Sequence, residues 1–249
     1  MSVHHEPPSY VRSILKLASA EFIGAAIVIG CAPVISRMYS VADFGHYELY
    51  YAFATIATAV SMLGYERSIL LENGKQEQFD ALIVAATCLI VATMSTFLCV
   101  MLVAQFRPNR EIVWIWTWAM PLFVFLAGVY NLSAIYLTRL GEFTVIARLK
   151  VASTVVAMTS QIAFAFGELG FIGLVLSNLL TQSVVAIYLF SICRSRAIAQ
   201  TFQFNRRRIA ELASKHWRLP LIALPGNMLA VFTNNLPVMF LARLDVELL

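Results

Sequence analysis

The sequence predicts an all-α protein with several membrane-spanning helices, and two observations carry this prediction. Of its 249 residues, 60% are hydrophobic and 13% are charged, whereas a soluble domain has about 25% charged residues. The hydrophobic residues also form continuous runs of about 20 residues, which match the thickness of a hydrocarbon core at ~1.5 Å per helical residue. Alternation of apolar and polar residues would be typical of a barrel strand, so the continuous runs disfavour a barrel.

The first predicted helix is an apolar run over residues 17–36, with one acid, Glu21, in its second turn. Arg37 closes this run, and a short turn at 39–45 leads into a returning helix, which we expect between residues 44 and 65. Later runs of the same kind predict helices at 81–103, 112–138, 151–166, 169–193 and 219–242.

Composition divides the chain into four parts. They are a polar tail at 1–13, a six-helix transmembrane lobe at 14–193, a basic linker at 194–218 and a seventh helix at 219–249. We expect the seventh helix to begin a second lobe.

The basic linker contains the pattern of a short amphipathic helix. Asn205 is a suitable N-cap, and Arg206, Arg207 and Lys215 share one side of the helix that would follow. The apolar side chains on the opposite side are Ile209, Leu212, Ala213 and Trp217. This arrangement is typical of a helix that lies on the surface of a membrane.

The distribution of basic residues predicts the orientation of the helices. Most of the 18 Lys and Arg residues lie in the tail, in the linker and in the loops on the same side. The positive-inside rule therefore places the N-terminus in the cytoplasm. Because the basic residues divide by membrane side, the net charge of +4 does not indicate a nucleic-acid partner.

The sequence contains no residue pattern of a hydrolase triad, a phosphate-binding loop or a metal site. The four cysteines lie inside apolar runs without C-x-x-C spacing, so we interpret them as small buried hydrophobic residues. We expect no enzymatic activity, no metal and no cofactor.

Polar side chains inside the predicted helices are the candidates for function, since a charge in the bilayer usually faces a cavity or a partner. Glu21 has two interpretations. It faces a cavity near Arg67 or Arg148, or it extends to the nearby cytoplasmic surface. Arg37 is expected to form an ion pair with Glu48 at the outer side.

Amides form a second group of candidates. Asn178 and Gln182 lie four residues apart on one face of the sixth helix, and Asn227 and Asn234 lie seven apart on one face of the seventh. Asn131 and Asn235 are further membrane amides. Such faces suit a cavity that binds sugars, although most membrane amides hydrogen-bond between helices, at roughly 0.6 kcal/mol each.

Several short motifs resemble those of the bacterial polysaccharide flippases, the O-antigen and capsule translocases of the MATE-like superfamily. Near the start they are LAS at 17–19, PVISRMYS at 33–40 and DFG at 43–45. At the end of the second helix the match is GYER at 64–67, where this family has a Tyr-Glu pair. Around the seventh helix the matches are ASK at 213–215, LPL at 219–221 and LPV at 236–238.

This resemblance implies a two-lobed transporter in the bacterial inner membrane that works by alternating access. The implied substrate is an undecaprenyl-diphosphate-linked oligosaccharide, moved from the cytoplasmic to the periplasmic leaflet. Membrane lipids and other membrane proteins of glycan assembly are the further implied partners. We expect basic residues to bind the diphosphate and amides to bind the sugars. The residues of this substrate-binding hypothesis are Glu21, Arg37, Glu66, Arg67, Arg148, Asn178, Gln182, Asn227 and Asn234.

Two other functions remain as alternatives. A MATE-type antiporter of small molecules would have several acids deep in one lobe, and a membrane-embedded enzyme of glycan assembly would have a large outer loop or a catalytic His/Asp set. The family has twelve or more helices, so we also expect this chain to be half of a transporter that is inactive by itself.

Overall fold

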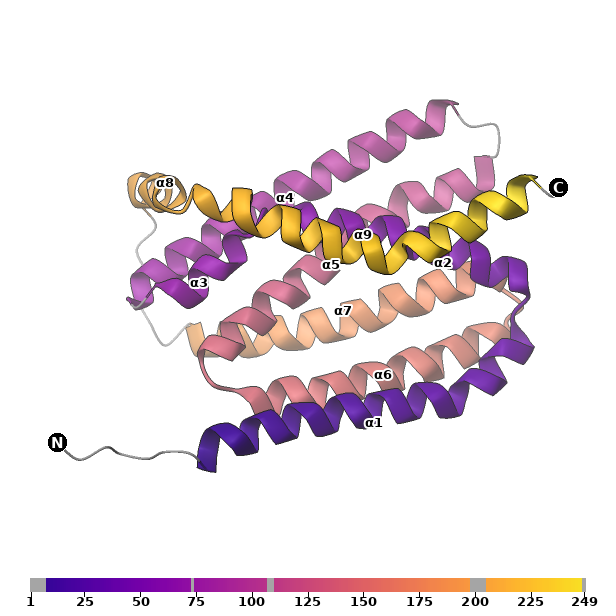
Figure 1. Ribbon diagram of the computed structural model, residues 1–249, viewed down its shortest axis with the longest axis horizontal. Coiled ribbons are helices and arrows are strands. Elements are labelled where there is room, and N and C mark those ends of the chain that lie inside the picture. The colour runs from indigo at the N-terminus through magenta and orange to yellow at the C-terminus, as the bar shows by residue number, and fades with distance from the viewer. Residues whose placement is uncertain (1–7, 73, 107–109, 198–204, 248–249) are drawn as a thin grey trace.

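The computed structural model describes residues 8–72, 74–106, 110–197 and 205–247, and within these residues the regular elements are helices (Figure 1). They are α1 (Pro8–Met38), α2 (Val41–Ser61), the 3₁₀ turn η1 (Tyr65–Arg67), α3 (Ser68–Leu71), α4 (Lys75–Phe106), α5 (Arg110–Arg139), α6 (Phe143–Phe166), α7 (Gly170–Ala197), α8 (Arg206–Lys215) and α9 (Arg218–Glu247). The predicted all-α fold is confirmed.

Five helices contain segments long and apolar enough to cross a membrane. The segments are Leu15–Met38, Lys75–Gln105, Ile115–Arg139, Phe143–Phe166 and Gly170–Ile192, in α1, α4, α5, α6 and α7. The more polar α2 lies inside the same bundle, where it contacts α5, α7 and α9. The chain is therefore a polytopic membrane protein, as predicted.

The bundle is built around α2, α5 and α7, and α1 packs mainly on α6 at one side (Figure 1). Its main core cluster includes Tyr47, Tyr50, Phe123, Leu174 and Val175. Tyr50 is fully buried, and its hydroxyl donates to the carbonyl of Ala119 at 3.0 Å. This bond satisfies a hydroxyl that would otherwise be costly to bury.

The turn between α1 and α2 is fixed by Asp43. Ser40 and Asp43 form a capping box at the start of α2. The Asp43 carboxylate also accepts a hydrogen bond at 2.8 Å from the backbone N–H of Phe171, in the first turn of α7. Gly170 has a φ of +54°, and a Cβ at this position would lie 2.7 Å from Asp43 Oδ1. One carboxylate therefore holds the starts of two helices together.

Several helices begin earlier than the hydrophobic runs. The predicted polar tail at 1–13 is helical from Pro8, where α1 begins, and proline is favoured in the first turn of a helix. The first seven residues lie outside the described part. Similarly, α6 begins at Phe143 rather than at 151, because charged side chains in the first turns of a membrane helix can extend toward water.

The short linker helix α8 forms as predicted, with Asn205 as its N-cap accepting from the N–H of Arg207 at 3.0 Å. Part of its apolar face packs on α4. Leu212 is buried, and Ile209 and Ala213 pack against the same cluster as Met62 and Val84. Trp217 is 55% exposed and lies outside this contact. In Figure 1, α8 lies across the end of the bundle rather than along the long helices.

Candidate functional site

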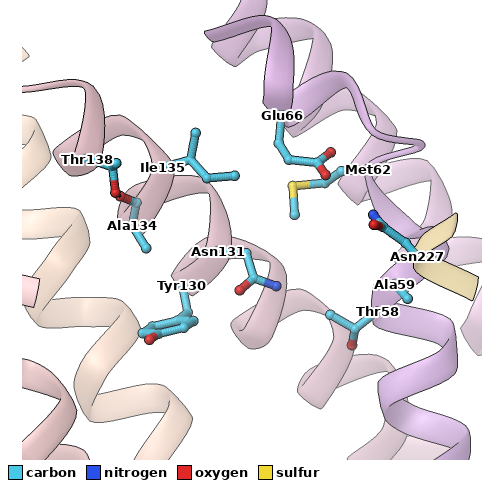
Figure 2. A pocket seen from close by; sticks show the side chains of 10 residues that line it. All are labelled: Thr58, Ala59, Met62, Glu66, Tyr130, Asn131, Ala134, Ile135, Thr138 and Asn227. Carbon is cyan, nitrogen blue, oxygen red and sulfur yellow. The ribbon is translucent and has the colours of Figure 1, made fainter. Parts of the chain in front are cut away.

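A polar cavity of about 310 Å³ lies between α2, η1, α5 and α9. Figure 2 shows the side chains that line it. The lining residues are Thr58, Ala59, Met62, Glu66, Tyr130, Asn131, Ala134, Ile135, Thr138 and Asn227. This volume is at the lower end of the ~300–1,000 Å³ of typical ligand pockets.

Glu66 is the one carboxylate in the lining of this cavity. It is 9% exposed, and its Oε2 atom is buried without a hydrogen-bond partner among the described residues. In Figure 2 its carboxylate extends between α2 and α5, beside the sulfur of Met62. Burial raises the pKa of the Glu66 carboxyl, and backbone hydrogen bonding at Glu66 and Gly64 and the charge of Arg67 oppose this effect. A buried acceptor without a donor is costly and is a position where a ligand can bind.

The backbone at the end of α2 explains the position of Glu66. Leu63 and Gly64 have φ values of 54° and 80°, which end the helix, and the tight turn η1 follows. A Cβ on Gly64 would lie 2.8 Å from the Cβ of Ala223, so glycine allows α9 to pass close to this turn. The close crossing brings Asn227 of α9 to the cavity.

Arg67 and Asn227 meet at the same place from distant parts of the sequence. Arg67 Nη2 donates to Asn227 Oδ1 at 2.7 Å, and Arg67 is exposed. A cation therefore lies beside a cavity that holds an unpartnered carboxylate oxygen. The other wall is one face of α5, where Tyr130, Asn131 and Thr138 supply neutral donors and acceptors.

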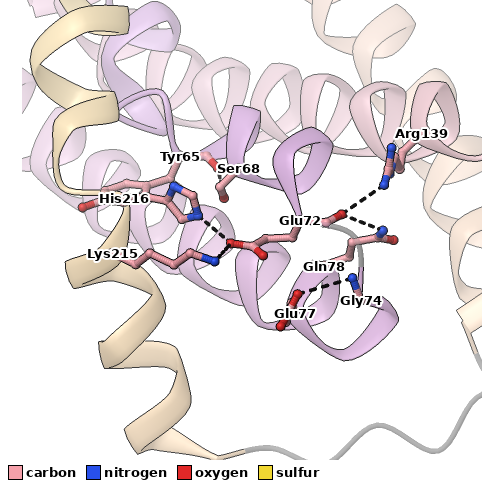
Figure 3. Close-up of polar contacts among 9 residues, drawn as sticks. All are labelled: Tyr65, Ser68, Glu72, Gly74, Glu77, Gln78, Arg139, Lys215 and His216. Atoms are coloured by element: carbon pink, nitrogen blue, oxygen red, sulfur yellow. Dashed lines mark hydrogen bonds and ion pairs between the residues drawn. The ribbon is translucent and has the colours of Figure 1, made fainter.

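A second polar cluster surrounds Glu72 at the same end of the bundle (Figure 3). The Glu72 side chain is 6% exposed, and its Oε1 atom lies 2.6 Å from both Lys215 Nζ and His216 Nε2. Its backbone carbonyl accepts from Gln78 Nε2 at 3.0 Å and from Arg139 Nη2 at 3.1 Å. Glu72 thereby connects α3, α4, α5 and the end of α8.

The hydrogen bonds from Lys215 and His216 lower the pKa of the Glu72 carboxyl to about 2. The same contact raises the pKa of Lys215. Glu72 is therefore charged at neutral pH, and its contacts hold α8 on the bundle.

The structure brings together three of the nine predicted site residues, Glu66, Arg67 and Asn227. The others lie elsewhere. Glu21 forms an ion pair with Lys150 of α6, rather than with Arg67 or Arg148. Arg148 lines a separate, mainly apolar cavity of about 270 Å³ between α6 and α7.

The remaining predicted residues are placed as follows. Asn178 Nδ2 donates to the Tyr47 hydroxyl at 2.7 Å, which is a contact between helices. Arg37 and Asn234 are exposed, and Gln182 is half-buried. The expected ion pair of Arg37 with Glu48 is absent from the part of the chain that the structure describes.

Sequence reasoning missed Tyr130, Thr138, Glu72 and His216. Thr138 follows Asn131 by seven residues, so their shared face on α5 was available as a signal. Glu72 lies in a polar segment that resembles an ordinary loop, and the sequence does not indicate its burial. Within the described ranges, no group of three His, Cys, Asp or Glu residues could hold a metal ion.

Comparison with known proteins finds a matching family model. A family model described as polysaccharide biosynthesis protein matches residues 34–244. No curated protein matches the chain, and no solved structure does. The matched range includes all of α2 and α5, which line the cavity, and the residues Glu66, Arg67 and Asn227.

Proposed function

This chain belongs to the polysaccharide biosynthesis protein family, and we propose that it moves a lipid-linked oligosaccharide across the membrane. The observation that carries the proposal is the cavity at Glu66, in which a buried carboxylate oxygen lacks a donor and an exposed arginine lies alongside. The membrane-spanning helices and the family support a role in membrane transport of a glycan precursor.

The chemistry of the cavity suits a sugar next to a phosphate. Sugar hydroxyls are donors, so one of them would satisfy Glu66 Oε2, and the amide of Asn131 offers both a donor and an acceptor. Arg67 would bind a phosphate oxygen through its guanidinium group, in exchange for its present bond to Asn227. Exchanging a protein contact for a substrate contact would release α9 from the cavity entrance.

The proposed substrate is an undecaprenyl-diphosphate-linked oligosaccharide, and the proposed direction is from the cytoplasmic to the periplasmic leaflet. Both follow from the resemblance to the flippases. Arg67, Arg139 and Lys215 lie at the end of the bundle that the charge pattern assigns to the cytoplasm. The substrate would enter there, and movement of helices around the cavity would expose it to the other side.

The test is leaflet-specific detection of the lipid-linked glycan in bacteria that carry substitutions in the chromosomal gene. A membrane-impermeant enzyme that oxidises terminal sugars would label the outer leaflet of spheroplasts. We expect Glu66→Gln and Arg67→Gln to lower outer-leaflet label at least tenfold while total glycolipid rises.

Glu21→Gln is the matched control, because it removes an equivalent charge from a site outside the cavity. It should label as the wild type does. Normal outer-leaflet label in Glu66→Gln and Arg67→Gln cells would contradict the proposal. Efflux of small cations without any change in the glycolipid would support the antiporter instead.

A further inference from the structure

A groove of about 330 Å³ runs between α4 and α8, separate from the cavity at Glu66. Its walls are apolar except for Thr87 and Arg206. The lining residues are Ile83, Val84, Thr87 and Cys88 of α4, and Arg206, Ile209, Ala210 and Ala213 of α8.

One wall of the groove belongs to a helix that is long and apolar enough to cross a membrane. This wall, residues 83–88 of α4, belongs to the membrane-spanning segment Lys75–Gln105. At ~1.5 Å per residue, this wall starts about 12 Å along the helix from Lys75. The groove is open on one side, since Thr87 and Ala210 are exposed on opposite walls. Lipid chains would therefore reach it from the bilayer.

Arg206 places a positive charge at one end of this groove. Its side chain is exposed and forms no hydrogen bond or ion pair with a described residue. The next residue, Arg207, differs because it pairs with Glu211 at 3.5 Å. Arg208 is exposed but does not line the groove. Of the three consecutive arginines, Arg206 is the one that lines the groove, and it has no acidic partner in the part of the chain that the structure describes.

We propose that this groove binds one anionic phospholipid of the membrane. One acyl chain lies between α4 and α8, and the phosphate binds the guanidinium group of Arg206. The charge of Arg206 complements a phosphate, and the apolar walls complement a methylene chain. The volume suits part of one chain rather than a whole lipid.

The proposal differs from general attraction of a basic helix to an anionic surface. Such attraction depends on the number of basic residues and not on their position. Arg206 and Arg208 lie two positions apart on α8, so they point to different sides of the helix. A lipid site requires Arg206 specifically, and this requirement separates the two explanations.

The experiment is native mass spectrometry of the purified protein titrated with phosphatidylglycerol or with zwitterionic phosphatidylcholine. The wild type should retain one phosphatidylglycerol more tightly than phosphatidylcholine. Arg206→Gln should weaken retention of phosphatidylglycerol about fivefold, the equivalent of one basic contact at a membrane surface. Arg208→Gln is the matched control with the same change in net charge, and it should leave this lipid in place.

A second variant tests the apolar part of the site. Ala210→Trp fills the groove from an exposed position, and it should remove bound phosphatidylglycerol while the circular dichroism spectrum stays helical. Equal weakening by Arg206→Gln and Arg208→Gln would overturn the proposal in favour of general surface attraction. Equal retention of the two lipids by the wild type, or undiminished binding by a folded Ala210→Trp variant, would overturn it as well.

Discussion

The Glu66 side chain lies in an energetically unfavourable environment. Its carboxylate is nearly fully buried with one oxygen unpartnered, and such a group costs about 1–3 kcal/mol when no ligand satisfies it. The motif GYER made Glu66 a candidate from the sequence. Its burial was not predictable, because burial results from α5 and α9, which are distant in the sequence.

The first prediction separates stability from function at Glu66. Glu66→Gln replaces a buried ionisable carboxyl with a neutral amide of similar shape, so we expect the purified variant to unfold at the same or a higher temperature than the wild type. Glycolipid transport should fall at the same time. A variant that is less stable but transports normally would show that Glu66 has a structural role.

The second prediction concerns Glu21, for which the structure favours a peripheral role. Its ion pair with Lys150 joins side chains that are 55% and 42% exposed, and exposed pairs contribute about 0–1 kcal/mol. Glu21→Gln should therefore lower the free energy of unfolding by less than ~1 kcal/mol. If Glu21→Gln impaired transport with only this small change in stability, Glu21 would have a role in substrate binding after all.

At the scale of helices, Asp43 supports two elements at once. Asp43→Ala removes the capping box of α2 and the acceptor for the Phe171 N–H. Ser40→Ala removes the cap alone. We expect a loss of about 1 kcal/mol for Ser40→Ala and about 2 kcal/mol for Asp43→Ala in chemical unfolding. Equal losses would show that the contact with α7 contributes nothing.

The contacts of Glu72 predict a dependence on pH. The folded-state pKa of Glu72 is depressed from 4.5 to about 2, so its stabilisation is fully present above about pH 4.5 and is lost as the pH falls toward 2. Hydrogen exchange in α8 should accelerate over this window. Glu72→Gln should make exchange in α8 fast already at neutral pH, with a loss of about 2 kcal/mol.

Gln76→Glu serves as a control for this pH experiment, because it changes the charge on α4 and leaves Glu72 with its contacts to Lys215 and His216. Exchange in α8 should keep its dependence on pH in this variant. Loss of protection in α8 at the same pH in wild type and Glu72→Gln would contradict the assigned role of Glu72.

The existence of the helices was more predictable than their ends. Hydrophobic runs located the long helices because a bilayer requires a fixed apolar length. They did not locate the first turns of α1, α4 and α6, in which polar side chains extend toward water. The docking of α8 on α4 was also missed, because a helix with an apolar face packs equally well on lipid or on protein.

At the scale of the whole molecule, the side-chain contacts between different helices were the least predictable feature. Arg67 and Asn227 are 160 residues apart and hydrogen-bond directly. The helical period of the sequence shows which face of a helix carries a residue, but it does not determine which other helix packs against that face. The pairing of Asn178 with Tyr47 rather than with a cavity has the same explanation.

The orientation of the molecule remains a prediction from the charge pattern. Gly141, between α5 and α6, should lie in the cytoplasm, and Glu168, between α6 and α7, in the periplasm. Reporter fusions at these two positions should therefore give opposite signals, with the phosphatase active at Glu168. A phosphatase active at Gly141 would invert the proposed entry side of the substrate.

Photo-crosslinking at the cavity tests the central claim most directly. A photoreactive phenylalanine analogue would replace Ile135, which lines the cavity, and, as the matched control, Ile187, which is 68% exposed on α7. We expect glycan-bearing lipid to crosslink at position 135 far more than at position 187, and Glu66→Ala to abolish the difference. Equal yields at the two positions, or yields at position 135 that are unchanged by Glu66→Ala, would contradict glycolipid binding in this cavity.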